Sequence, residues 1–376
     1  MSEPRPLRVL LVHTESLYFG GAEVQLGRLV AGLAGGSVHA TVACVAGSPM
    51  ARALPPGTAT LELPANQPFS LGSLRRQLQA LGAAEFDVLH GWGARAWELT
   101  SVAGAWARRP TLGTLHDHPQ AEYMTARRQR LARWCARFGL DEVTVVSQAL
   151  RDACVAAGWP ARKLTVIHNG LPVPPESQRS PRSAGRLRLG FLGSLAEGKG
   201  LQDLLAAVAE LERHAPGCWE LQVAGRAQDA AGETLVQALT RTYSACPWWP
   251  RVTWRGWVAT EEFLREIDAL VFPSRTFETF GLAPAEAALA GVPVVAARVG
   301  AVPEVVWEGQ TGWLFTAGDV AACAAILQRL VARPEEVAAA GQAGRHHVRA
   351  MFPTAKMLTG YTARYAALGR GGREQV

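Results

Sequence analysis

The feature that most constrains the fold is an alternation of short apolar strands with helical segments, which occurs twice along the chain. The first series begins with RVLLVHT, AEVQLGRLVAGLA and HATVACVAG and continues through DVLHGWG, PTLGTLHD, EVTVVS and KLTVIHNG. An order of strand, helix and strand is typical of a parallel sheet that is covered by helices on both faces. The sequence therefore predicts an α/β first domain over residues 1–171.

The segment LPVPPESQRSPRSAG follows and has the composition of a linker, which we place at residues 172–186. The alternation then restarts with RLRLGFLGSL and continues through ELQVAGR, RVTWRGWV, DALVFPS and GVPVVAA, which predicts a second Rossmann-like domain over 187–355. Residues 356–376 are expected to form a C-terminal helix and tail that pack back on the N-terminal domain. Such domains bind ligands at the carboxyl ends of their strands, so two that face each other would share a site in the crevice.

Composition narrows the class of protein. A length of 376 residues suits two domains, which favours an enzyme. No apolar run approaches the roughly 18 residues that a membrane-spanning helix needs, and the N-terminus lacks a signal-peptide pattern. The six cysteines show no metal-ligand spacing, so we expect buried free thiols in a cytoplasmic protein. The net charge of +6 favours anionic partners such as phosphorylated ligands or acidic lipids, and no motif supports nucleic acid.

The stretch VFPSRTFETFGLAPAEAALAGVPVVAA predicts a strand, a loop that holds Glu278, and a helix with Glu286 and Pro284 in its first turn and Gly291 after its end. Because Gly281 and Pro284 argue against one continuous helix, the spacing of the glutamates does not specify a glycosidase acid/base pair. Free N–H groups at a helix start favour a phosphate instead. The alternative is that Glu286 only complements the helix dipole and Glu278 is a solvated loop residue.

These residues resemble a known family. ETFGLAPAEAALAGVPVVAARVGAVPEVVWEGQTGWLF is similar to the E-x(7)-E region of glycosyltransferase family 4, whose members are retaining enzymes of the GT-B fold. The similarity includes GGAE at residues 20–23, TLHDH, VIHNG, FLGSLAEGKG, and Phe352 followed by Tyr361 and Tyr365. The resemblance implies two Rossmann-like domains with parallel sheets that face a central cleft. It also implies transfer of a sugar from a nucleoside diphosphate sugar to a hydroxyl of a glycan or lipid-linked acceptor.

The resemblance implies that residues 1–171 form the acceptor-side domain and residues 187–355 the nucleotide-sugar-binding domain, and it assigns donor-binding roles in the second. Glu286 is implied to bind the ribose hydroxyls, for which a carboxylate is chemically apt, and Glu278 to contact the donor sugar. Backbone N–H groups for the sugar and the distal phosphate would come from Phe280, Gly281 and Leu282.

Lys199 matches the lysine of the family's KG signature, which neutralises the diphosphate. A solvated charge is the alternative, but this chain has only three lysines among 38 basic residues, which favours a function for this one. Family members usually carry arginine at the position of Ser194. One of two expected donor-binding cations is therefore absent, and Arg226 in VAGRAQ is the candidate that could compensate.

In the first domain, Gly20 and Gly21 are expected to form a flexible loop where the backbone approaches the diphosphate, with a simple tight turn as the alternative. His116 matches the family's histidine that faces the donor sugar, although a histidine at a strand end is more often an ordinary satisfied side chain. His118 is a neighbouring candidate. The NG dipeptide at residues 169–170 predicts a turn.

The basic segment AEYMTARRQRLARWCARFGL, residues 121–140, has a helical pattern. Its apolar residues fall at i, i+3, i+4 and i+7, and they are Leu131, Trp134, Cys135 and Phe138. Four arginines flank this stripe, at Arg127, Arg130, Arg133 and Arg137. Packing of the stripe against the sheet is the simpler expectation. The alternative is peripheral contact with an anionic membrane at its inner face, because interfacial helices combine these features.

The resulting hypothesis is a metal-independent, front-face glycosyl transfer in which His116, Glu278 and Lys199 are the catalytic candidates. No Asp-x-Asp motif or His/Cys cluster is present to hold a metal, and no cofactor is expected. Two alternatives are a GT-B nucleotide-sugar epimerase and a non-catalytic nucleotide-sugar-binding relative, the second suggested by Ser194. A dehydrogenase is disfavoured because FGGAE is not the G-x-G-x-x-G fingerprint.

Overall fold

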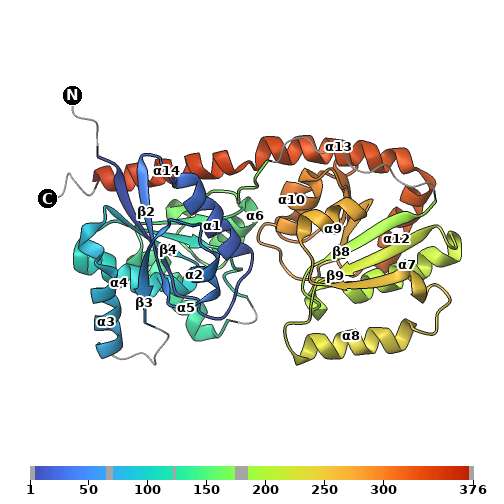
Figure 1. The fold of residues 1–376 in the computed structure, drawn as a ribbon, viewed down its shortest axis with the longest axis horizontal. Coiled ribbons are helices and arrows are strands. Elements are labelled where there is room, and N and C mark those ends of the chain that lie inside the picture. Colours follow the sequence, from blue (N-terminus) through green and yellow to red (C-terminus); the bar gives the residue numbers. More distant parts are fainter. Residues whose placement is uncertain (1–4, 65–70, 122–123, 174–184, 372–376) are drawn as a thin grey trace. The chain divides into compact units, whose positions relative to one another are not determined.

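The computed structural model describes residues 5–64, 71–121, 124–173 and 185–371. The chain divides into two compact units, one formed by residues 1–170 and 352–376 and the other by residues 171–351. Each unit contains one parallel sheet with helices against it (Figure 1). Most of the expected linker, 172–186, lies outside the described residues. The chain returns to the first unit at Phe352, whereas the sequence placed that division between residues 355 and 356.

The sheet of the first unit has the order β3-β2-β1-β4-β5-β6-β7, with every strand parallel to its neighbours. Its strands are β1 (Leu7–His13), β2 (Val38–Val45), β3 (Ala59–Leu63), β4 (Val88–Trp92), β5 (Thr111–Leu115), β6 (Glu142–Val145) and β7 (Leu164–Val166). Its helices are α1 (Gly21–Leu33), α2 (Pro49–Ala53), α3 (Leu71–Leu81), α4 (Trp97–Ala107), α5 (Ala126–Trp134), α6 (Gln148–Ala156) and α14 (Thr354–Gly371).

Side chains of β1 alternate between two hydrophobic cores. Val9 and Leu11 belong to the core that includes α1 and α14, whereas Leu10 and Val12 belong to the core that includes α4. A strand directs successive side chains to opposite faces, so a strand that is apolar throughout must be covered on both. The continuous apolar run in the sequence reflects this burial.

The sheet of the second unit has the order β10-β9-β8-β11-β12-β13 and is also parallel. Its strands are β8 (Leu187–Leu192), β9 (Trp219–Ala224), β10 (Val252–Gly256), β11 (Ala269–Phe272), β12 (Val294–Ala297) and β13 (Gly312–Phe315). Its helices are α7 (Leu201–His214), α8 (Ala230–Tyr243), α9 (Thr260–Glu266), α10 (Leu282–Leu289), α11 (Val302–Val305), α12 (Val320–Ala332) and α13 (Pro334–Met351). In each sheet the chain adds strands first on one side of the unit's first strand and then on the other, so the order switches between β1 and β4 and between β8 and β11. Ligands of open α/β sheets bind at the carboxyl ends of the strands at such a switch point.

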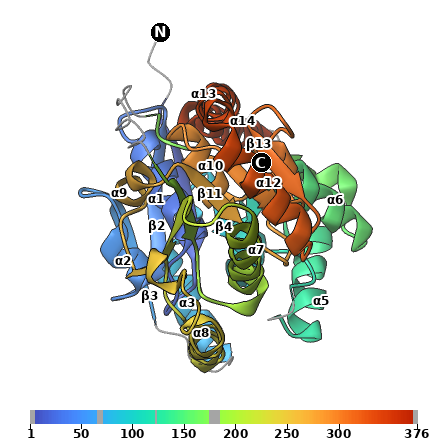
Figure 2. The same cartoon turned by 90° about the vertical axis from the view of Figure 1, so that its right-hand side faces the viewer.

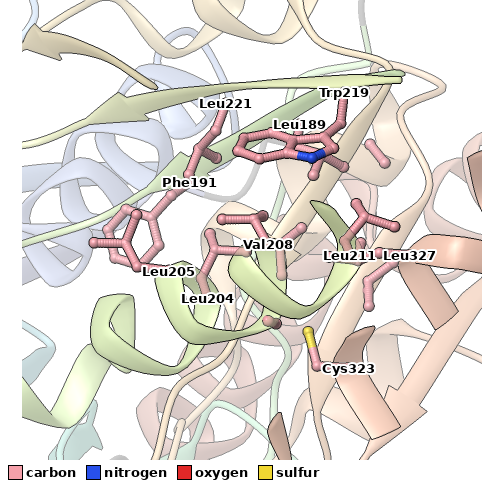
Figure 3. Packing of buried hydrophobic residues seen from close by; sticks show 14 of the residues in the cluster. Leu189, Phe191, Leu204, Leu205, Val208, Leu211, Trp219, Leu221, Cys323 and Leu327 are labelled. Carbon is pink, nitrogen blue, oxygen red and sulfur yellow. The ribbon is translucent and has the colours of Figure 1, made fainter. Parts of the chain in front are cut away.

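Helices α7 and α12 lie side by side against the second sheet (Figure 2). Leu204, Val208 and Leu211 on α7 have helical spacing and lie in one buried cluster with Trp219 of β9 and Leu327 of α12 (Figure 3). Complete burial of one such side chain stabilises the folded state by roughly 1.5–3 kcal/mol. Because β8 and β9 are part of this core, it fixes the strand ends from which their loops begin.

Helix α14 is anchored to the first sheet by buried polar contacts. His90 on β4 bonds the Tyr365 hydroxyl through Nδ1 and the Thr114 hydroxyl through Nε2, both at 2.7 Å. The Tyr361 hydroxyl lies 3.2 Å from the Thr114 hydroxyl. Burial lowers the pKa of His90 to about 3, so its imidazole is neutral at pH 7. The terminal Phe352, Tyr361 and Tyr365 pattern therefore marks where the chain joins the first unit.

The expected packing of the apolar stripe in residues 121–140 is wrong for its two aromatic residues. Cys135 is buried, but Trp134 is 55% exposed and Phe138 is 66% exposed. The helix changes at Cys135 to i+5 hydrogen bonding, with Leu140 N donating to Cys135 O at 2.9 Å. This wider turn follows Trp134, and the Trp134 and Phe138 rings lie 6.0 Å apart, so the two aromatic residues share one exposed face.

Candidate active site

The loop after β8 carries the KG signature and packs tightly against the loop after β11. Gly200 has φ 73°, and a Cβ there would lie 2.0 Å from the carbonyl oxygen of Pro273. The Arg275 N–H donates to Gly198 O at 2.8 Å. Only glycine permits this backbone conformation and this close approach to Pro273 O at position 200. The contacts of Gly198 and Gly200 with the loop after β11 therefore fix the position of Lys199 between them.

Lys199 and Glu278 form an ion pair. The lysine Nζ donates to Glu278 Oε1 at 2.6 Å, and the Ser274 hydroxyl donates to the same oxygen at 2.7 Å. The Lys199 side chain is 31% exposed and that of Glu278 is 13% exposed. The backbone oxygen of Glu278 accepts from Ala301 N at 2.8 Å. The structure thus brings together the two charges that the resemblance assigns to the diphosphate and to the sugar.

Helix α10 begins at Leu282, directly after Gly281, whose φ of 86° reverses the chain. Phe280 is 2% exposed and anchors the turn in the core. The sequence placed Glu286 in the first turn of the helix, but it is the fifth residue and half-buried, because the helix begins before Pro284. This correction weakens the view that Glu286 only complements the helix dipole, since that effect falls off beyond the first turn.

Ser194 and Arg226 lie in adjacent loops after β8 and β9. Leu195 N donates to Arg226 O at 3.0 Å, and Gly193 N donates to Ala224 O at 3.1 Å. The Arg226 side chain is exposed and forms no ion pair with another residue that the structure describes. Arg226 thus lies in the loop next to that of Ser194, and whether it compensates for Ser194 stays a prediction.

In the first unit, Glu23 joins the start of α1 to the end of β1. Its Oε2 accepts from Gly20 N at 2.7 Å, and its Oε1 lies 3.0 Å from His13 Nε2. Gly20 is the N-cap and Gly21 the first residue of α1. The structure places these two glycines at the start of α1, where the buried Glu23 carboxylate holds the Gly20 N–H as one half of a capping box, and their approach to the diphosphate stays a prediction.

Burial alone would raise the pKa of Glu23, but hydrogen bonds from His13 and Gly20 N–H outweigh it, so the pKa lies below its ordinary value. Glu23 and His13 were missed as site residues in the sequence. The available signal was the spacing of GGAE, in which an acid follows the N-cap by three residues.

His116 follows β5 directly, with its ring centroid 4.8 Å from that of Trp92. Burial lowers its pKa to about 4, while the Glu23 charge acts in the opposite direction and that of His13 adds to the lowering. Its Nε2 is buried and has no hydrogen-bond partner in the described part of the chain. The imidazole is thus neutral at pH 7, and its buried Nε2 has a hydrogen-bonding position that no described residue uses.

Two other expected positions behave differently. His118 Nδ1 accepts from Gln120 N at 3.2 Å, which is a local contact. The turn predicted at residues 169–170 is absent from the structure there. Gly170 N instead donates to Gln25 Oε1 at 3.0 Å, and a Cβ on Gly170 would lie 2.7 Å from Thr354 Cα. Glycine is needed at this point because the start of α14 approaches closely.

Comparisons with known proteins bear on the family and the fold. A family model described as Glycosyltransferase Family 4 matches residues 19–173, and one described as Glycosyl transferases group 1 matches residues 186–333. HepE of Anabaena, solved in complex with UDP, has the same fold with a TM-score of 0.84 at 24% identity, covering 96% of this chain and 100% of that one.

Curated relatives include a glycogen synthase of Mycobacterium tuberculosis, which is 28% identical over 77% of this chain and 70% of its own length. A GDP-mannose-dependent phosphatidylinositol monomannoside mannosyltransferase of Mycolicibacterium smegmatis is 31% identical over 55% of this chain and 57% of its own.

The two parallel α/β units and these matches define an enzyme, a glycosyltransferase of GT-B type. More narrowly, the chain belongs to glycosyltransferase family 4, whose model covers most of the first unit while the group 1 model covers most of the second. The fold class and family predicted from the sequence are thereby confirmed. No helix in the described ranges combines the length and apolar character needed to cross a bilayer. Within those same ranges, no group of three or more His, Cys, Asp or Glu side chains could hold a metal ion.

Proposed function

We propose that this enzyme is a retaining, metal-independent transferase that moves a hexose from a nucleoside diphosphate sugar to an acceptor hydroxyl of a glycan or lipid-linked molecule. The observation that carries the proposal is the Lys199–Glu278 pair at 2.6 Å beside the start of α10. A diphosphate carries more negative charge than one carboxylate and would recruit Lys199. Glu278 would then be available to accept a hydrogen bond from a hydroxyl of the donor sugar.

The chemical step that we propose is the front-face substitution implied by the family resemblance. The bond between the anomeric carbon and the diphosphate oxygen breaks as the acceptor oxygen bonds to that carbon on the same face. The acceptor proton passes to the departing phosphate oxygen. Lys199 and the backbone N–H groups of Phe280, Gly281 and Leu282 stabilise the charge that develops there, which is the main contribution of the protein. In the first unit the Gly20 N–H is held by Glu23, so we assign the backbone contact with the diphosphate to Gly21, and we assign to His116 a hydrogen bond with a hydroxyl of the transferred sugar.

Lys199→Ala tests this assignment. We expect kcat/KM to fall at least about a hundredfold with thermal stability retained, because removal of one group that stabilises a leaving-group charge typically costs about a hundredfold or more in rate. Near-parental turnover would refute the role of Lys199. Analysis of the product by NMR would report whether the anomeric configuration is retained. Conversion of donor without any acceptor would instead indicate an epimerase, and binding without transfer or hydrolysis would indicate a non-catalytic protein.

Glu286 is assigned to the ribose hydroxyls of the donor nucleotide. Glu286→Ala should weaken nucleoside diphosphate binding in calorimetry by about tenfold, the usual effect of losing hydrogen bonds to a charged group. Unaltered affinity would remove Glu286 from the ribose site. HepE was solved with UDP, and the mannosyltransferase relative is named for GDP-mannose, so UDP and GDP sugars are the two donor classes to compare. A thermal-shift screen with both nucleotides distinguishes them, because a selective ligand raises stability by mass action.

The exposed face of residues 126–138 supports a lipid-linked acceptor. Trp134 and Phe138 have ring centroids 6.0 Å apart, and the Arg137 guanidinium lies 5.4 Å from the Phe138 ring centre. Arg127, Arg130 and Arg133 are exposed nearby along the same segment. Exposed aromatic side chains with flanking arginines are suited to the interface of an anionic membrane.

Binding to liposomes that contain anionic lipid tests this contact. Arg130→Glu with Arg133→Glu should abolish binding, because each basic residue near such a surface contributes about 1 kcal/mol. Arg213→Glu with Arg241→Glu is the matched control, since it makes the same change in net charge at exposed positions of the second unit. Absence of binding by the parent protein, or equal loss in the control, would contradict the proposal.

A further inference from the structure

Arg275 joins the loop after β11 to the segment that carries the KG signature and to the start of α7. Its backbone N–H donates to Gly198 O at 2.8 Å. Its side chain makes two hydrogen bonds with the Asp203 carboxylate, one from Nε to Oδ2 at 2.7 Å and one from Nη2 to Oδ1. Asp203 lies in the first turn of α7 and is 4% exposed. One residue of the loop after β11 therefore holds the neighbouring segment on both sides of Lys199.

The contact between Arg275 and Asp203 fixes an orientation as well as a distance. Two N–H···O bonds between a planar guanidinium and a planar carboxylate define the relative position of both groups, whereas a lysine ammonium is a point charge on a flexible chain. The Arg275 side chain is 42% exposed, so solvent screens its charge and the pair contributes little to global stability. We therefore expect the pair to act mainly on the relative position of the two segments.

Two ion pairs link residues 197–203 to residues 274–278 in the described part of the chain. One is Lys199–Glu278 and the other is Arg275–Asp203. In the proposed function a diphosphate recruits Lys199, so the first pair is broken when the donor binds. Neither member of the second pair is assigned to the donor. The Arg275–Asp203 pair is then the ionic link that remains between the two segments while Lys199 is bound to phosphate.

We propose that Arg275 and Asp203 are positioning residues that keep Lys199 at the diphosphate after it has left Glu278. This inference rests on the proposed function, in which Lys199 binds the diphosphate. Lys199 lies between two glycines, whose backbone is conformationally free by itself, so contacts with neighbouring segments must hold it. Arg275 and Asp203 supply such contacts on either side without touching the donor. Their loss should weaken the contact of Lys199 with phosphate although every donor-binding group is still present.

Calorimetry on the full chain tests this proposal with UDP or GDP, whichever binds the parent protein more tightly. Arg275→Lys keeps the positive charge but removes the fork, so the nucleotide affinity should fall about fivefold, within the range for coupled residues of one network. Asp203→Asn keeps the shape but removes the charge and should have a similar effect. In the Lys199→Gln background both losses should disappear, because the ammonium that the pair positions is gone.

Arg188→Lys is the matched control. Arg188 makes the same two bonds with Asp268, from Nε to Oδ2 at 3.1 Å and from Nη2 to Oδ1 at 2.8 Å. This pair lies at the amino ends of β8 and β11, whereas Lys199 and Glu278 follow the carboxyl ends of the same strands. Arg188→Lys should lower the temperature of thermal unfolding and leave the nucleotide affinity unchanged.

Parental affinity in both Arg275→Lys and Asp203→Asn would overturn the proposal. Equal losses with and without Lys199→Gln would also overturn it, because additive effects show that the pair does not act through Lys199. An equal loss of affinity in Arg188→Lys would do the same, since any weakened ion pair of the unit would then suffice. Parental affinity in Lys199→Gln alone would instead contradict the proposed function, on which this inference rests.

Discussion

The Lys199–Glu278 ion pair predicts opposite effects of one substitution on nucleotide binding and on sugar transfer. In Glu278→Gln the amide oxygen can still accept from the Ser274 hydroxyl, but the charge that holds Lys199 is gone. A nucleoside diphosphate would no longer compete with the carboxylate for this cation. Nucleotide binding should therefore become tighter while transfer becomes slower.

The expected change in nucleotide affinity follows from the solvent exposure of the Lys199–Glu278 ion pair. With side-chain exposures of 31% for Lys199 and 13% for Glu278, the pair is partly screened by solvent and contributes about 1 kcal/mol. If binding of UDP or GDP no longer has to break this ion pair, the saving of about 1 kcal/mol raises the affinity about fivefold. Transfer should fall about tenfold or more, because a neutral amide is a weaker acceptor for a sugar hydroxyl than a carboxylate.

Isothermal calorimetry with each nucleotide, beside a transfer assay with its sugar, measures both effects. Glu308→Gln is the control, since it removes one charge from the exposed ion pair with Arg298 and should leave nucleotide affinity unchanged. In the double variant with Lys199→Gln, the gain from Glu278→Gln should disappear. Parental or weaker nucleotide affinity in Glu278→Gln alone would refute the idea that the diphosphate displaces the carboxylate.

Three further predictions concern the frame of the site. Tyr365→Phe removes the partner of a fully buried nitrogen on His90 and should lower the free energy of unfolding by about 1–3 kcal/mol in urea denaturation; an unchanged value would contradict this. Gly200→Ala places a methyl group 2.0 Å from Pro273 O at a φ of 73°. The temperature of thermal unfolding and the affinity for nucleotide should therefore both fall. Parental values of both would show that the loop adjusts freely. Acid should destabilise the chain as pH falls from 6.5 towards 4, because His90 and His116, with folded pKa values of about 3 and about 4, gain protons first in the unfolded state. Chemical denaturation at several pH values measures this slope, which should decrease in His116→Gln.

Much of the candidate site could be predicted from local sequence. Glycine and proline mark where strands pass into helices, so the loops after β8 and β11, with Lys199 in one and Glu278 in the other, were placed at strand ends from the sequence. The sequence did not place the start of α10 as accurately as it placed these two loops. It depends on the left-handed turn at Gly281, and the sequence therefore assigned Glu286 to the wrong turn.

The periodicity of the sequence by itself determined the parallel α/β character of both units, because side-chain alternation and helical spacing follow from backbone geometry over a few residues. Only the tertiary structure decided which distant groups meet. Lys199 reaches Glu278 across 79 positions and His90 reaches Tyr365 across 275, and each contact depends on how sheets and helices pack. The same holds for the exposed Trp134 and Phe138, because helical spacing shows which residues share a face but not whether that face packs against the sheet.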